Sequence, residues 1–324
     1  MGQVVTDNMP AGTLETAAVI GQREDLSDVI ERIDPSEVPI FSALKKTSVK
    51  ATRKDWLVQE LKAPDTDNAQ HEGYDVVILG VKPRVMYSNY TQILATSFSI
   101  SHTVEAVDIA GIDSEIAEQK VLRGLELRKD LDAILSFDQV AKGSDPRDMA
   151  TISSWITNGI VGATTGAMPD GDGEDVPVSG DAAALTLAMI DTGQKEATAA
   201  GGKPTIMFMG QDQKLAFSGL HASGASDNRL NMTAANPVPA KLIGAVDMYL
   251  SDFGVLACAV DLWMPVDRIY GLDLKHVACG ALPGSAFTSY AVAKSGASTK
   301  WAVEWEGTFV ADAPKAHWAI YDLS

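Results

Sequence analysis

Cysteine is almost absent from the sequence, with only Cys258 and Cys279 among 324 residues. Both lie in apolar segments with the character of strands, so we predict buried free thiols rather than a disulfide or a reactive thiol. The five histidines are scattered, and no two of them stand at the spacing of metal ligands. These shortages argue against a disulfide-stabilised secreted domain and against a metal centre, and we predict no cofactor.

Long hydrophobic runs are also missing. No uninterrupted apolar stretch approaches the roughly 20 residues that a membrane-spanning helix needs. The N-terminus lacks the basic-then-apolar pattern of a signal peptide, and its match to the short myristoylation pattern rests on very few fixed positions. We therefore expect a soluble chain that is not exported and has no membrane partner.

Catalytic signatures are a third absence. The sequence contains no G-x-S-x-G nucleophile elbow, no H-E-x-x-H zinc motif and no Walker A loop. The strand expected at 204–209 leads into a helix through the single Gly210, where a dinucleotide site needs a cluster of glycines. Paired acidic residues are abundant, but no pattern gathers them in a pocket. We therefore do not expect an enzyme.

The acidic stretch "DGDGEDVPVSGD" (170–181) comes nearest to a ligand-binding motif. Its sixth position is Asp175, where the sharp turn of a calcium loop requires glycine. We therefore favour a solvated acidic loop and leave cation binding open as the alternative. Four of its carboxylates match ligand positions one, three, five and twelve: Asp170, Asp172, Glu174 and Asp181.

Positive charge is scarce: 26 Lys and Arg residues face 43 Asp and Glu residues, which gives a formal net charge of -17. Because gripping phosphates requires a basic surface, this charge argues against nucleic-acid binding as the main task. Basic residues do cluster in one place, either as a solvated loop or as an electrostatic contact with an acidic neighbouring copy of the chain. This basic cluster consists of Lys45, Lys46, Lys50, Arg53 and Lys54.

A short amphipathic helix is predicted at 24–34, after a small and polar segment at 1–20. Pro35 ends the helix, and a small apolar knot around Phe41 follows. Such an early helix has little local core, so its apolar stripe needs a partner elsewhere in the chain or on another copy. The stripe consists of Leu26, Val29, Ile30 and Ile33.

A long β excursion is predicted over roughly 48–100. Strand-like runs occur around Trp56 and at 76–81, and they enclose the turn-rich segment 62–75. Period-two alternation at 97–104 predicts a further, half-buried strand. Since a two-stranded ribbon alone in water is only marginally stable, we expect this long β segment to be stabilised by contacts outside itself.

The strongest helical segment is 114–138, which would be roughly 37 Å long. Asp113 or Ser114 can cap its N-terminus. Its apolar residues form two stripes that are rotated from each other, so we expect the helix to contact different partners along its length. One stripe contains Ala117, Val121 and Leu125, and the other contains Leu127, Leu131, Ile134 and Leu135.

The Gly-, Ser- and Pro-rich stretch 141–181 is the clearest shift in composition and the preferred domain boundary. Beyond it helix and strand patterns mix, and a regular strand follows at 299–310, with Glu304 and Glu306 on a face open to solvent or a partner. Together these elements predict an α+β fold. Between the boundary and this strand we predict helices near 182–199 and 210–220, and strands at 204–209 and around 244–282.

Four segments resemble one branch of tailed-phage major capsid proteins, and they occur in the order typical of that family. The first, "GQREDLSDVIERIDPSEVPIFSAL" (21–44), resembles the family's N-terminal signature. The others are "NAQHEGYD" (68–75), "SNYTQILATSFSISHTVEAVDIAGIDSEIAEQ" (88–119) and "VDMYLSDFG" (246–254). These motifs are specific to the family and span most of the chain, so the resemblance implies the Hong Kong 97-type capsid fold.

The resemblance also implies how the chain is divided. An N-terminal arm at 1–47 would lie over neighbouring subunits, and an extended β-hairpin loop at 48–98 would reach across an adjacent subunit. A peripheral domain with a long spine helix would occupy 99–155 and resume at 283–324. A compact axial domain at 156–282 would lie near the five- and six-fold axes.

The implied function is assembly: copies associate through pentamers and hexamers into the icosahedral shell that encloses the double-stranded DNA of a tailed-phage virion. We expect a portal and separate scaffold proteins as partners, with a decoration protein as an optional one, and assembly in the host bacterial cytoplasm. The alternatives are an encapsulin-like compartment shell of the same fold and a soluble α/β enzyme built around 182–282.

Intersubunit contacts are predicted in the arm, the basic cluster and the loop, because these parts offer surface that a lone subunit cannot bury. No motif identifies residues for covalent crosslinks between subunits. The candidate contact residues are Leu26, Val29, Ile30, Ile33, Phe41, Lys45, Lys46, Lys50, Arg53, Lys54, Trp56, His71, Glu72 and Tyr74.

Overall fold

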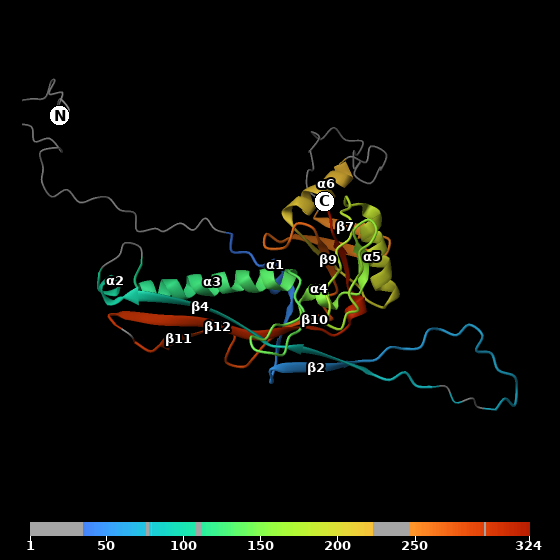
Figure 1. Cartoon of the computed structure of the whole chain (residues 1–324). Helices are drawn as coiled ribbons and strands as arrows, with labels where there is room; N and C mark the ends of the chain where they lie inside the picture. The colour runs from blue at the N-terminus through green and yellow to red at the C-terminus, as the bar shows by residue number, and fades with distance from the viewer. Residues whose placement is uncertain (1–34, 76–77, 79, 108–111, 223–246, 295) are drawn as a thin grey trace, which may run out of the picture.

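The chain is elongated, as Figure 1 shows. A long helix lies along one sheet, a compact region with a second sheet lies at one end, and a loop projects from the body. The helix predicted at 24–34 lies outside the described residues. The structure is a computed structural model, and it describes residues 35–75, 78, 80–107, 112–222, 247–294 and 296–324.

A five-stranded sheet forms the long part of the body. Its central strand β12 (Ser298–Ala311) pairs antiparallel with β4 (Gln92–Ser101), β10 (Val277–Ala281) and β11 (Thr288–Val292). Strand β1 (Lys45–Ser48) pairs parallel with β10. The long strand predicted near the C-terminus is confirmed as β12.

Helix α3 (Glu115–Ser136) packs on β4 and β12 and confirms the predicted long helix. Ser114 caps it, because its hydroxyl accepts a hydrogen bond from the backbone N–H of Ala117. Of the two predicted stripes, the one that contains Leu131 is buried in the main core, whereas Val121 of the other is 53% exposed. The two stripes therefore do meet different surroundings.

The second sheet has six strands in the order β5-β13-β9-β6-β8-β7. Helix α5 (Leu187–Ala199) packs on β5 and β13, and Phe217 of helix α6 (Gln211–Ala222) lies in the core of the same region. Both helices and the strand predicted at 204–209 are confirmed within a few residues. The strands are β5 (Asn158–Val161), β6 (Ile206–Met209), β7 (Met248–Ser251), β8 (Gly254–Val260), β9 (Ile269–Leu272) and β13 (Trp318–Tyr321).

The stretch 141–181 contributes to the core despite its loop-like composition. Met149 is fully buried, and the short helix α4 (Ile152–Trp155) is buried next to α3 and β12. Small residues are required here by close approach: a Cβ on Gly173 would lie 2.8 Å from the ring of Trp155. The shift in composition thus marks tight packing and turns rather than an exposed connection.

The projecting loop begins as a two-stranded ribbon of β2 (Arg53–Val58) and β3 (Val85–Tyr90), which pair antiparallel. A second strand is expected at 76–81, but Ile78, Gly80 and Val81 belong to no strand, and the other three residues of this run lie outside the described residues. The run has the apolar composition of a strand. Pairing with β2 nevertheless falls to residues 85–90, where Tyr87 packs beside Trp56 of the same ribbon.

The alternating pattern at 97–104 ends earlier than predicted. Strand β4 stops at Ser101, and α2 (His102–Ala106) follows it directly. The Ser101 hydroxyl accepts a hydrogen bond from the backbone N–H of Val104 and so caps this short helix. The partner strand β12 begins at Ser298, opposite Ser101, and beyond this pair the backbone N–H of His102 donates to the carbonyl of Ala297 at 3.2 Å.

Glu306 does not face solvent, which corrects the prediction for the polar face of β12. Its side chain is enclosed by other parts of the chain, and the residue is only 8% exposed. Its Oε1 accepts hydrogen bonds from Nη2 of Arg147 and Oγ1 of Thr91, both at 2.9 Å. A polar residue in a strand of alternating pattern can thus belong to an internal hydrogen-bond network. The sequence pattern alone does not distinguish such a buried residue from an exposed one.

Both cysteines are free thiols, as predicted, with Cys279 buried and Cys258 half-buried. Burial raises the pKa of Cys279 to about 12 and that of Cys258 to about 11. Because the thiolate is the reactive form, these thiols are inert near neutral pH.

Candidate assembly surfaces

The base of the predicted arm is anchored on the body. In α1 (Pro39–Ala43), Ile40 is fully buried against α3, and the rings of Phe41 and Phe287 lie 5.9 Å apart, edge to face. Phe41, a predicted contact residue, therefore packs within its own chain. Four other predicted contact residues lie outside the described residues, and their contacts stay predictions: Leu26, Val29, Ile30 and Ile33.

Two hydrogen bonds also hold this base. The backbone N–H of Phe41 donates to Oδ1 of Asp132 on α3, and the indole N–H of Trp263 donates to the carbonyl of Glu37 at 2.9 Å. Trp263 follows β8 of the second sheet. One short segment thus contacts both the long helix and the region of the second sheet.

Asp132 and Asp261 form a fully buried carboxyl pair at the same junction. Oδ1 of Asp261 accepts a hydrogen bond from the backbone N–H of Trp263 at 2.9 Å, and the Oδ2 atoms of both carboxyls are buried without a hydrogen-bond partner among the described residues. Burial, followed by the charge of Asp261, raises the pKa of Asp132 to about 8, against the opposing hydrogen bond from Phe41 and the attraction of Lys46. Near neutral pH Asp132 therefore retains its proton.

This retained proton gives stability a pH dependence. A carboxyl whose pKa is raised by folding binds a proton that the unfolded chain releases, so wild-type stability should fall as the pH rises from about 4 towards 8. In Asp132→Asn, Oδ1 still accepts from the backbone N–H of Phe41, and the neutral amide does not titrate. We expect this variant to lose most of that slope, which is up to about 1.4 kcal/mol per pH unit.

Urea unfolding of the wild type and the variant at a series of pH values measures the slope. Asp312→Asn is the matched control, because it makes the same Asp-to-Asn change at an exposed position outside the pair. The control should keep the wild-type slope. Equal slopes for the wild type and Asp132→Asn would contradict a proton retained on Asp132.

The basic cluster lies where the chain enters the ribbon, and its members have different surroundings. Nζ of Lys46 lies 3.1 Å from the ring centroid of Phe41 and donates to the carbonyl of the same residue. Arg53 pairs with Asp55 at 2.7 Å. The other three members are the half-buried Lys54 and the exposed Lys45 and Lys50. Lys46 and Arg53 are thus engaged within the chain, and contact of the cluster with another copy stays a prediction.

Aromatic side chains attach the ribbon to the body. The ring of the fully buried Trp155 lies 5.1 Å from that of Trp56 and 5.8 Å from that of Tyr87. Just beyond the ribbon, Glu60 pairs with Lys315 at 2.5 Å. The indole of Trp56, predicted as an intersubunit contact, is therefore half-buried against its own chain, and only its open part is left for a neighbour.

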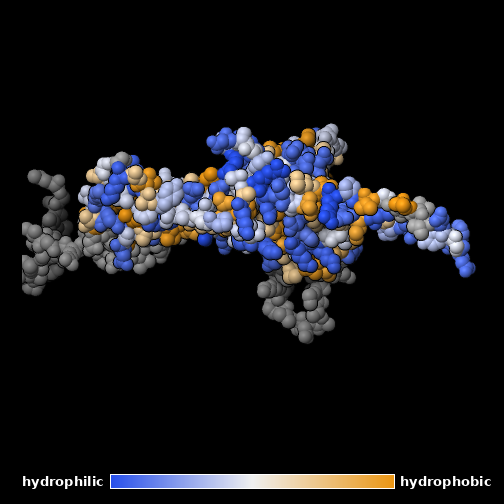
Figure 2. All heavy atoms as spheres, turned by 90° about the horizontal axis from the view of Figure 1, so that it is seen from below, coloured by the Kyte–Doolittle hydropathy of each residue, from blue (hydrophilic) through white to orange (hydrophobic). Residues whose placement is uncertain are grey.

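Beyond the ribbon the loop extends away from the body (Figure 1). The predicted contact residues His71, Glu72 and Tyr74 are exposed together at a turn, in which the backbone N–H of Tyr74 donates to the carbonyl of His71 at 3.2 Å. Figure 2 shows hydrophobic side chains gathered near the root of this projection. The large exposed apolar residues of the loop are Leu57, Leu61, Ile78, Val81, Val85 and Met86.

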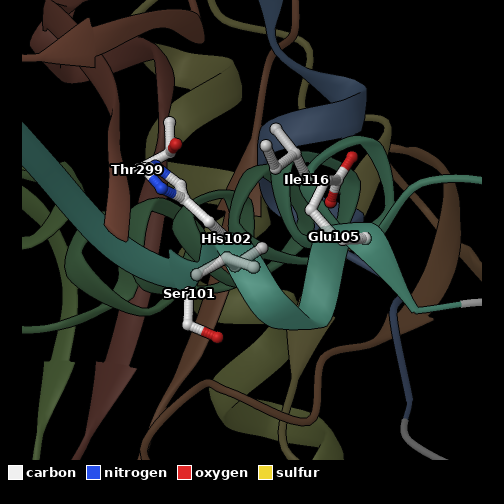
Figure 3. A pocket seen from close by; sticks show the side chains of 7 residues that line it. Ser101, His102, Glu105, Ile116 and Thr299 are labelled. Atoms are coloured by element: carbon white, nitrogen blue, oxygen red, sulfur yellow. The ribbon is translucent and has the colours of Figure 1, made fainter. Parts of the chain in front are cut away.

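Two open hollows of the body border helix α3. One, of about 230 Å³, lies where β4, α2 and the start of α3 meet, and Figure 3 shows His102 and Glu105 lining it. The hydroxyl of Ser114 donates to Glu105 there at 2.9 Å. The other, of about 570 Å³, lies between α3 and β4 and is largely apolar, with Leu94 and Phe137 in its lining.

The described ranges contain neither a candidate metal centre nor a candidate membrane-spanning helix. Within them, no group of three or more His, Cys, Asp or Glu side chains could hold a metal ion. In the acidic loop, Asp181 instead accepts a hydrogen bond from Thr164, and Asp175 accepts one from the backbone N–H of Asp170. Among the helices in these ranges, none combines the length and the apolar character needed to cross a bilayer.

His317 is a core residue. It is fully buried, and its Nδ1 accepts a hydrogen bond from the backbone N–H of Asp273 at 3.1 Å. Burial lowers the pKa of His317 to about 4, so the imidazole is neutral near pH 7. Its role is to satisfy a backbone donor inside the fold.

Sequence reasoning missed the exposed apolar side chains of the loop and the buried acid pair. For the loop a signal was available, since Leu61, Ile78 and Val81 stand within or beside a turn-rich polar segment. For Asp132 and Asp261 no local signal exists, because the two residues are far apart in sequence and each resembles an ordinary surface carboxylate.

Comparison with known proteins identifies the family. A model of the SU10 major capsid protein family matches residues 9–324, which is nearly the whole chain. A curated major capsid protein of Escherichia phage Phieco32 is 30% identical over 119 residues. That match covers 37% of this chain and 34% of the relative, so it spans about a third of the relative's length.

Solved phage structures share the fold at low sequence identity. A chain of the cyanophage A-1(L) capsid matches with a TM-score of 0.62 and 12% identity, over 95% of this chain and 98% of that one. A chain of Gordonia phage Cozz matches with a TM-score of 0.62 and 14% identity, over 100% and 99%. A chain from Phage G major capsid and decoration proteins matches with a TM-score of 0.56 and 11% identity, over 93% and 95%. The predicted α+β fold of the Hong Kong 97 type is confirmed.

The family match rests on the sequence, and the structural likeness adds the fold. The encapsulin-like and enzyme alternatives are not favoured by either comparison. The match extends from close to the N-terminus through the last residue. The chain therefore belongs to the SU10 major capsid protein family.

Proposed function

We propose that copies of this chain associate through pentamers and hexamers into the icosahedral head shell that encloses the DNA of a tailed phage. The observation that carries this proposal is the apolar surface of the projecting loop. Leu61, Ile78 and Val81 are each at least 87% exposed. Large apolar side chains on an extended loop gain stability when another copy covers them.

The proposed association is heterologous: the loop of one copy contacts a different surface on the next. Such contacts close into rings when the rotation between copies allows it. The formal net charge of -17 makes copies repel one another, and the basic cluster would offset this repulsion locally. Family membership and the extended shape of the chain support this geometry.

The proposed roles of the segments follow the parts of the fold that the family resemblance implies. Residues 1–47 form the arm and 48–98 the extended loop. Residues 99–155 and 283–324 form the peripheral domain, and 156–282 the axial domain. The ribbon with its projecting loop and the long helix α3 support the loop and peripheral parts of this division. The six-stranded sheet contains the strands of 156–282 together with β13 from the last segment, so the chain returns to the axial region at its end.

Further partners belong to the same proposal. We include a portal, separate scaffold proteins and an optional decoration protein, with packaged DNA contacted only non-specifically and assembly in the host bacterial cytoplasm. The matching Phage G structure contains decoration proteins together with major capsid proteins. We also propose that the role is structural and not catalytic, on the strength of the family match.

Electron microscopy of the purified full-length chain, combined with sedimentation, tests the proposed function. Closed shells, or rings with five-fold and six-fold symmetry, are the expected result. Adding salt should favour assembly, because it screens the repulsion between acidic copies. A single species with the mass of a monomer or dimer, at every salt and protein concentration tried, would contradict the proposal.

A further inference from the structure

The loop meets the body at the crossing from β3 to β4. Strand β3 pairs with β2 in the ribbon as far as Tyr90, and β4 pairs with β12 in the five-stranded sheet from Gln92 onward. Only Thr91 separates the two strands. The direction of the loop relative to the body is therefore decided by the residues around this crossing.

Asn89 is fully buried at the crossing, and its amide uses its full hydrogen-bonding capacity. Nδ2 donates to the carbonyls of Ala150 and Phe309 at 2.9 and 2.7 Å. Oδ1 accepts from the backbone N–H groups of Ala150 and Tyr90 at 2.8 and 2.9 Å. One side chain of the ribbon is thus tied to β12 and to the segment that precedes α4.

Thr91 extends this network. Its hydroxyl donates to Oε1 of Glu306 at 2.9 Å, and the same oxygen pairs with Arg147 at 2.9 Å. Its backbone N–H donates to the carbonyl of Thr52 at 2.8 Å, on the chain that enters the ribbon. Buried hydrogen bonds are strongly directional, whereas the ring contacts of the ribbon tolerate a broader range of geometries, and the exposed ion pair beyond it contributes little.

We propose that Asn89 is a positioning residue that sets the angle at which the loop leaves the body, and with it the geometry of the loop's contact with a second copy. This inference rests on the proposed function. The loop acts as a long lever, because the chain from Asn89 back to Tyr74 reaches at most roughly 50 Å. A rotation of about 10° at its base would move the tip by roughly 8 Å. A shift of that size takes the tip off its partner surface.

Asn89→Asp in the full-length chain tests this directly. Aspartate has nearly the same shape but cannot donate, so the carbonyls of Ala150 and Phe309 would face an acceptor in place of their N–H donors. Gln211→Glu is the matched control, because it makes the same amide-to-carboxylate change at an exposed position of α6, away from the loop and the crossing. Electron microscopy gives the yield and diameter of the shells, and circular dichroism and urea unfolding report on the fold.

The expected result is a folded Asn89→Asp chain that yields at least tenfold fewer closed shells of wild-type diameter, with open or differently curved assemblies in their place. The control should assemble as the wild type does. A folded Asn89→Asp chain with wild-type yield and diameter would overturn the inference. If Asn89→Asp does not fold, Thr91→Val is tested in its place, since it removes one hydrogen bond of the same network without adding charge. Fewer shells of wild-type diameter would then support the inference, and wild-type yield and diameter would overturn it. Failure of the wild type to assemble would instead refute the proposed function.

Discussion

Deletion of residues 62–75 is expected to abolish closed shells while leaving a subunit that folds. This segment holds the tip with His71, Glu72 and Tyr74, and it contributes no residue to either core cluster. The hydrogen bond from Tyr74 to His71 and the ion pair of Lys62 with Asp65 both stay inside the segment. Cutting it out therefore removes reach and contact surface at little cost to the fold.

The chain can close over this deletion without strain. The ribbon still ends at the pair Val58↔Val85, and the residues left on either side of the cut exceed the short connection that a hairpin needs. Circular dichroism and urea unfolding should therefore match the wild type, whereas electron microscopy should show no closed shells.

A same-length replacement of 62–75 by Gly and Ser is the matched control for loop length. It restores reach but not the side chains of the tip, so it separates the two contributions: shells return if reach alone matters and stay absent if the tip makes specific contacts. Normal particles from the deleted chain itself would show that the loop is not an assembly element. The copies would then have to associate through another surface of the body.

Elements governed by local chemistry could be predicted from the sequence. Helix α3 was placed within two residues at each end, because the cap at Ser114 and the apolar periodicity that includes Leu131 are both local signals. Strand β12 was recognised because its two faces differ in polarity over many residues. The capsid fold itself was recognised from family motifs, and no arrangement of these elements in space followed from periodicity alone.

Features that depend on distant partners could not be predicted. The apolar run at 76–81 has the composition of a strand, yet β2 pairs with Val85–Tyr90, where Asn89 reaches Ala150 and Phe309. Glu306 occupies a polar position in its strand and is buried by Thr91 and Arg147. In each case the deciding neighbour is far away in sequence, so no window of local sequence contains the cause.

The candidate assembly surface also combines residues that the sequence predicts with residues that it does not. The tip residues were predicted because the motif that contains His71 and Tyr74 resembles the loop tip of the family. The apolar surface of Leu61 and Val81 was missed, because an apolar residue normally signals burial, and the turn-rich polar segment beside these residues was the weaker signal. Only a structure in which the loop stands away from the body shows that a lone subunit leaves these side chains uncovered.

Gly271→Ala is expected to destabilise the chain by about 3 kcal/mol, at the upper end of the usual range for overpacking. Gly271 lies in β9 directly opposite Trp318 of β13. A Cβ on this residue would lie 2.0 Å from Cε2 and 2.2 Å from Nε1 of the indole. The indole cannot retreat, because its N–H donates to Oε1 of Gln194 at 2.9 Å and helix α5 closes its other flank at Gly193.

Urea unfolding of the full-length, unassembled chain measures this loss. Gly124→Ala is the matched control: it lies in α3, a Cβ there meets nothing within 4 Å, and alanine should raise stability by up to about 1 kcal/mol through helix propensity. A double-mutant cycle with Trp318→Leu tests the cause, because a smaller partner should remove most of the penalty at Gly271. Equal penalties in both backgrounds would show that the strain arises from the backbone of β9 and not from the indole.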